Sequence, residues 1–157
     1  GESIKLLVEP FDTRRDLKNV LAHELGHQLT FDLGEHANKM PWWVLEGTAE
    51  LGAARYAGGF ERSDGMVRSW AKRGGLLPWA SLVDFRGEAA RHQVHVYVQG
   101  AHMMKYITDR FGRDGRNAWL ASMAGGAAVE EATRRTFDMG FEDLDLAWRS
   151  TLPPQGD

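Results

Sequence analysis

Two histidines that can bind one metal ion stand four residues apart in the segment 23–27, which reads HELGH. On a helix, residues four apart lie one turn apart on the same face, so both imidazole rings can reach one ion. Glu24 projects beside this pair, where it can take a proton from a metal-bound water without being a ligand itself. The segment therefore predicts two metal ligands, His23 and His27, and a general base, Glu24, which is the combination that a metal-dependent hydrolase needs.

A hydrolytic zinc site has three protein ligands and one open position for water, so a third ligand is expected. Glu46 and Glu50 stand four residues apart in a segment that opens with Pro41, a residue suited to the first turn of a helix. We predict that Glu46 completes the metal site and that Glu50 accepts a hydrogen bond from a ligand histidine. His36 is the next ligand to consider, but its polar loop favours a solvated histidine.

These segments resemble those of the gluzincin zinc peptidases, in particular the aminopeptidase N-like and peptidase MA-like branch. The similarity rests on HELGH at 23–27, eighteen intervening residues, and then Glu46 within WVLEGTAE at 43–50. It extends to Tyr97 in the segment YVQGA, where that branch keeps a tyrosine that stabilises the transition state. Residues 137–148 are similar to the closing helix of the family. The resemblance therefore covers most of the chain.

The resemblance implies a zinc-dependent metallopeptidase with one Zn²⁺ per chain. With the helical periodicity of the sequence, it implies a mainly α fold: a single zincin-like helical catalytic domain over 1–157. The sequence itself allows at most one short N-terminal strand. Glu24 is expected to act as the base on the zinc-bound water, while zinc and Tyr97 stabilise the developing oxyanion of a peptide or protein substrate. Endopeptidase activity is slightly favoured, because the Gly-Ala-Met-Glu-Asn stretch that reads a free amino terminus in the exopeptidase branch does not occur.

Two other functions stay open on the same residues. A non-catalytic helical module would use a structural zinc whose four positions are all filled by protein. A zinc amidase or esterase would act on small molecules in a narrow, closed pocket. Gluzincins also place a sheet before the helix that carries the two histidines, and this sequence has room for one strand, at 3–8.

Length, composition and charge argue against several other classes. The 157 residues, 43% of them hydrophobic, suffice for one domain with a core, and no stretch is long and apolar enough to cross a membrane. A net charge of −3 without a concentrated basic run argues against nucleic-acid binding. The lack of cysteine leaves the compartment open, with a weak preference for an exported, extracytoplasmic bacterial protein. Because the chain starts at Gly1 without methionine, we expect an excised or processed domain.

Apolar periodicity, capping residues and glycines predict a mostly helical chain. The first helix rests on apolar residues at helical spacing, namely Leu17, Val20, Leu21, Leu25 and Leu29. Seven helices are expected, at 14–31, 41–56, 63–72, 88–111, 114–123, 128–137 and 142–151, with a loop at 32–40.

A few residues within these helices carry separate expectations. Gly47 and Gly52 should allow the second helix to approach the first closely, as a shared metal requires. Trp42 and Trp43 are expected to pack in the core or the cleft wall. His102, like the other histidines of the long helix, is expected to be a hydrogen-bonded polar group at the edge of the core.

Overall fold

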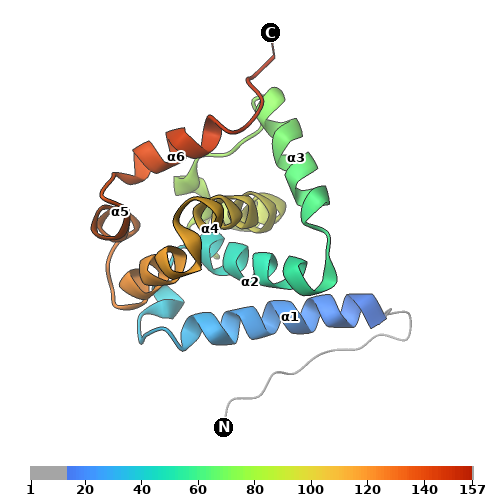
Figure 1. The fold of residues 1–157 in the computed structure, drawn as a ribbon. Coiled ribbons are helices and arrows are strands. Elements are labelled where there is room, and N and C mark those ends of the chain that lie inside the picture. The colour runs from blue at the N-terminus through green and yellow to red at the C-terminus, as the bar shows by residue number, and fades with distance from the viewer. Residues whose placement is uncertain (1–13, 157) are drawn as a thin grey trace.

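The segments 23–27 and 43–50 lie on two neighbouring helices, α1 and α2, which run side by side (Figure 1). A computed structural model describes residues 14–156 of the chain. Over that range the protein is mainly α, as predicted, with helices α1 Arg14–Phe31, α2 Trp42–Ala57, α3 Phe60–Lys72, α4 Gln93–Ala124, α5 Val129–Phe137 and α6 Phe141–Arg149. No strand occurs within 14–156, and the strand predicted at 3–8 lies outside the described residues.

Glycines cap the C-termini of α2 and α4 and the N-termini of α3 and α6. α1 and α2 have the predicted bounds to within one residue. α3 begins at Phe60, before the predicted start at Ser63, because Gly58 and Gly59 turn the chain with positive φ angles and Gly59 already caps the next helix. The helices predicted at 88–111 and 114–123 form one kinked element, α4, preceded by a 3-10 turn at Glu88–Arg91. The kink lies at Gly112, where φ is 76° and ψ is 174°.

α4 is the central helix, and α2, α3 and α5 pack against it (Figure 1). Tryptophans fill the core between these helices: the ring of Trp43 lies 4.3 Å from that of Trp79 and 6.2 Å from that of Trp119, measured between centroids. Trp42 and Trp43 are both buried, as their predicted packing role requires. Within 14–156, no helix has the length and apolar composition of a membrane span.

Glycines allow α2 to approach both α1 and α4 closely. Gly47 of α2 faces Gly100 of α4, and a Cβ atom on Gly47 would lie 2.4 Å from the carbonyl carbon of Gly100. A Cβ atom on Gly26 of α1 would lie 2.8 Å from the Cα atom of Ala49 in α2. The prediction that Gly47 and Gly52 bring α2 against α1 is therefore wrong. Gly47 meets α4, Gly26 makes the approach between α1 and α2, and Gly52 has open space around it.

The apolar residues that predict α1 do not form a buried face. Val20, Leu25 and Leu29 are 46%, 46% and 69% exposed. The side of α1 that packs on α2 carries small and polar residues instead, including Gly26 and the buried Thr30, whose hydroxyl donates to the Gly26 carbonyl at 2.8 Å. The spacing of these residues therefore predicts the helix correctly but not the face that it buries. α1 packs on α2 through Gly26, and Leu25 and Leu29 stay exposed.

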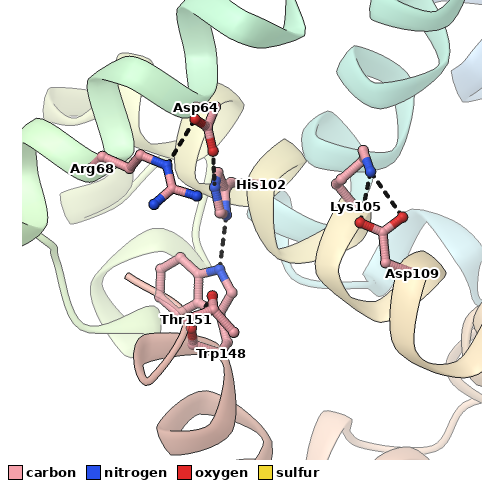
Figure 2. Close-up of polar contacts among 7 residues, drawn as sticks. All are labelled: Asp64, Arg68, His102, Lys105, Asp109, Trp148 and Thr151. Atoms are coloured by element: carbon pink, nitrogen blue, oxygen red, sulfur yellow. Dashed lines mark hydrogen bonds and ion pairs between the residues drawn. The ribbon is translucent and has the colours of Figure 1, made fainter. Parts of the chain in front are cut away.

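A buried histidine links three helices (Figure 2). His102 of α4 accepts a hydrogen bond at Nδ1 from the indole N–H of Trp148 in α6, at 2.9 Å. Its Nε2 lies 3.1 Å from Asp64 Oδ1 in α3, and Asp64 also accepts from Arg68 Nε at 2.8 Å. Because Nδ1 is an acceptor, Nε2 carries the proton and donates to Asp64. His102 is thus a buried, hydrogen-bonded residue, as predicted, and burial lowers its pKa although Asp64 acts in the opposite direction.

Candidate metal centre

Three predicted ligands converge between α1 and α2. Glu46 Oε2 lies 3.1 Å from His23 Nε2 and 3.2 Å from His27 Nε2. The two Nε2 atoms of the histidines are 3.1 Å apart. Ligand atoms of a tetrahedral zinc site, each about 2.0–2.2 Å from the ion, stand about 3.4 Å from one another. The three side chains therefore form a nearly equilateral triangle of the size that one ion needs.

The chemistry of these donors also fits a divalent cation. Two imidazole nitrogens and a carboxylate oxygen are electron-pair donors, and they can satisfy one another only by sharing protons. A cation satisfies all three lone pairs at once, and this mixture of two imidazoles with one carboxylate suits zinc. In the part of the chain that the structure describes, His23, His27 and Glu46 are the residues grouped closely enough to hold a metal ion.

Trp42 orients the carboxylate of Glu46. The indole N–H donates to Glu46 Oε1 at 2.7 Å, which leaves Oε2 directed at the two histidines. Both side chains lie on α2, one turn apart, so the helix itself brings them together. Trp42 was expected only to pack, and this contact was missed. The spacing of Trp42 and Glu46, four residues apart, is the signal that could have indicated it.

The two histidines have unequal support. His23 Nδ1 lies 3.3 Å from Glu50 Oε2, which is the contact expected for a residue that orients a ligand histidine. His27 Nδ1 is buried and has no hydrogen-bond partner among the described residues. Its ring instead stacks on Phe31, with the centroids 6.0 Å apart. Glu50 therefore contacts His23 as predicted, whereas the ring contact with Phe31 is the one found for His27.

The charges of the centre perturb one another. Burial alone would lower the pKa of His23, but hydrogen bonds to Glu46 and Glu50 outweigh it and raise that pKa to about 9. Burial would raise the pKa of Glu46, but the hydrogen bonds from His23 and His27 prevail and hold it well below its usual range. Without a metal ion, the site therefore favours a carboxylate paired with a protonated His23. A metal must displace that proton when it binds.

Tyr97 and Glu24 border the ligands. The Tyr97 ring, on α4, stacks on that of His23 at 5.6 Å with an interplanar angle of 12°. Burial, followed by the negative charge of Glu46, raises the pKa of Tyr97 to about 12, so its hydroxyl keeps its proton at neutral pH. Glu24 is half-buried, and no hydrogen bond joins it to other residues in the range 14–156. The structure thus places a proton donor and an unengaged carboxylate near the three ligands.

His36 and His95 lie elsewhere. The backbone N–H of His36 donates to the Ala124 carbonyl at 3.0 Å, at the end of α4, and its Nδ1 is buried without a partner among the described residues. His36 lies in the loop, as predicted, and does not belong to the ligand cluster, but it is half-buried and not fully solvated. His95 stacks on Trp70 at 4.0 Å, and its Nε2 lies 3.1 Å from the Gly75 carbonyl oxygen.

The case for a metal at this centre rests on the types of donor and on their distances. Comparison of the chain with protein-family models, with curated proteins and with solved structures found no match.

Proposed function

We propose that this chain is a zinc-dependent metallopeptidase of the gluzincin type, in which His23, His27 and Glu46 hold one Zn²⁺. The observation that supports it best is the triangle of three ligand atoms 3.1–3.2 Å apart, with Oε1 of the carboxylate already engaged by Trp42. The order and spacing of the segments, which resemble those of gluzincins, point to the same chemistry. A peptide or protein is the proposed substrate, with internal peptide bonds favoured.

Zinc, when bound, supplies a Lewis acid that lowers the pKa of a coordinated water to about 7 and polarises a carbonyl group. Glu24, which has no other partner, takes a proton from the attacking water and passes it to the leaving amine. Tyr97 donates a hydrogen bond to the carbonyl oxygen as that oxygen becomes negative. Burial raises the pKa of the Tyr97 hydroxyl, which favours retention of the proton that this role needs.

Two alternatives use the same ligands. A structural zinc would require a fourth protein ligand, whereas the cluster within 14–156 contains three. Glu50 is not a fourth member, because it contacts Nδ1 of His23, and Nε2 of His23 is the atom that faces Glu46. This favours an open position. A zinc amidase or esterase for small molecules would share the ligands and the base, and only its substrates distinguish it.

Turnover of an internally quenched peptide and of casein by zinc-loaded protein tests the proposal. Glu24→Gln should keep zinc and fold but lose hydrolysis, because an amide cannot take the proton of water. Tyr97→Phe should keep zinc and lower kcat by roughly 10²–10³, with a much smaller change in KM, because its hydrogen bond strengthens in the transition state.

Tyr106→Phe is the matched control for Tyr97→Phe. Tyr106 lies nine residues further along α4, about two and a half turns away and so on the opposite face, where its hydroxyl contacts Arg110. This variant should hydrolyse peptides like the wild type. Full turnover by Glu24→Gln would overturn the proposed mechanism. Zinc-dependent cleavage of small amides or esters without cleavage of either peptide substrate would favour the amidase or esterase.

A further inference from the structure

A cleft of about 800 Å³ lies between α1, α2, α3 and α4. None of the proposed metal ligands lines it, and neither do Glu24 and Tyr97. On α2, Arg55 of this cleft follows Glu46 by nine residues, about two and a half turns, so the two side chains leave opposite faces of the helix. The cleft is therefore separate from the candidate metal centre, and its volume is typical of a site for a small molecule.

Three arginines in this cleft lack an acidic partner. Arg55 and Arg113 are exposed, and neither makes a hydrogen bond or an ion pair with another described residue. Arg116 is half-buried and donates to neutral acceptors, Asn117 Oδ1 at 2.9 Å and Thr108 Oγ1 at 3.3 Å. Burial, followed by the like charges of Arg113 and Arg55, lowers the pKa of Arg116. Arg55 and Arg113 thus both repel Arg116, and no carboxylate is paired with any of the three.

The remaining charges of the cleft do not neutralise this cluster. Lys105 lines the cleft too, but Asp109 holds it at 2.8 and 2.6 Å through both carboxylate oxygens (Figure 2). Glu61 is the other acidic lining residue, and it pairs with none of the arginines. Four cationic side chains against two acidic ones leave a net charge of +2, on a chain whose overall charge is −3. A local excess of this kind attracts an anion.

The kink of α4 at Gly112 lies next to this cleft, directly before Arg113. The residue has a φ of 76° with nothing within 4 Å of a Cβ atom, so the kink is a backbone conformation that glycine adopts without strain. Arg113 and Arg116 follow it directly, on the segment of α4 after the bend. The cleft is also lined by apolar side chains that come from segments far apart in the sequence: Leu29, Leu33, Leu51, Phe60 and Leu120.

We infer that this cleft binds a small amphipathic anion. Its carboxylate or phosphate group lies among Arg55, Arg113 and Arg116, and its apolar part packs against the apolar side chains of the cleft. The guanidinium fork of arginine matches both oxyanions with paired hydrogen bonds. These apolar side chains give the rest of the ligand a surface on which to leave water. The site does not depend on the proposed peptidase activity, because it shares no residue with the candidate metal centre.

Isothermal titration calorimetry of the zinc-loaded protein with octyl phosphate and with octanoate tests the inference and shows which oxyanion is preferred. Inorganic phosphate and 1-octanol, which each carry half of the ligand, should bind at least tenfold more weakly than the better of the two anions. The double variant Arg55→Gln/Arg113→Gln should weaken that anion roughly tenfold, at about threefold for each exposed charge. Higher ionic strength should weaken binding further.

Arg73→Gln/Arg86→Gln is the matched control, because it removes the same charge from exposed arginines outside the cleft. It should bind the anion like the wild type. Equal loss in the two double variants, or no loss in Arg55→Gln/Arg113→Gln, would overturn the inference. Binding that disappears when zinc is removed by a chelator would also overturn it, since the anion would then lie on the metal.

Discussion

Gly47→Ala tests whether the contact between α2 and α4 positions the candidate site. Its new methyl group would lie 2.4 Å from the carbonyl carbon of Gly100, whereas an ordinary contact begins at 3.4 Å. The two helices must therefore separate by about 1 Å, because the obstructing atoms belong to a backbone that cannot rotate away. Tyr97 lies on α4 one turn before Gly100, and Glu46 directly precedes Gly47 on α2. The separation moves the tyrosine away from the ligands.

The expected cost follows from two opposing effects. Overpacking costs about 1–3 kcal/mol, and the better helix propensity of alanine returns up to about 1 kcal/mol, so the free energy of unfolding should fall by about 1–2 kcal/mol. In a domain of this size that lowers Tm by roughly 2–8 °C. A 1 Å displacement of Tyr97 should lower peptide turnover about 100-fold. Zinc should stay bound, because the α1–α2 contact that joins the ligands is not changed.

Gly52→Ala is the internal control. It makes the same substitution on the same helix, where a Cβ atom would have open space, and should raise the free energy of unfolding by up to about 1 kcal/mol. Calorimetric or denaturant-induced unfolding of both variants provides the comparison, followed by zinc content and peptide turnover. If Gly47→Ala were as stable as Gly52→Ala, the packing argument would be refuted.

Two further predictions concern the residues that hold ligands and helices in place. Trp42→Phe removes the donor to Glu46 Oε1 and should weaken zinc binding roughly tenfold in a chelator competition; unchanged affinity would show that Trp42 only packs. The pKa of His102 in the folded protein lies below the 6.5 of an unfolded chain, so the unfolded state binds a proton first as the pH falls. The free energy of unfolding should therefore decrease below pH 6.5, by at most about 1.4 kcal/mol per pH unit. In denaturant titrations between pH 4 and pH 8, His102→Gln, which retains a donor and an acceptor, should flatten this dependence; an identical pH profile in both proteins would contradict the assignment.

The members of the cluster could be predicted because each segment carries its own local signal. His23 and His27 share one face of a helix by spacing alone, and the segment around Glu46 was singled out by its resemblance to gluzincins. That Glu46 meets the two histidines depends on the packing of α2 on α1. The bounds of α1 and α2 follow from proline, glycine and periodicity, which also act over short distances. These signals do not depend on how the helices pack.

The features that the sequence did not predict depend on tertiary contacts. Nothing in the pattern around Gly47 says whether it meets α1 or α4, because the answer depends on Gly100, more than fifty residues away. Leu25 and Leu29 have the spacing of a buried stripe, yet α1 packs through Gly26. The cleft that contains Arg55, Arg113 and Arg116 combines residues of α2 with residues of α4 beyond its kink, so no single segment of the sequence indicates that it exists.

The zinc content of protein purified without chelator tests the central claim most directly. The triangle of ligands predicts one zinc per chain in the wild type and loss of zinc in Glu46→Ala. Glu50→Gln, which changes only a residue that orients His23, should bind zinc roughly 10 to 100-fold more weakly. Elemental analysis after dialysis against zinc measures all three proteins. Sub-stoichiometric zinc in the wild type that dialysis cannot restore, or a full complement of zinc in Glu46→Ala, would contradict the assignment of these residues as a metal centre.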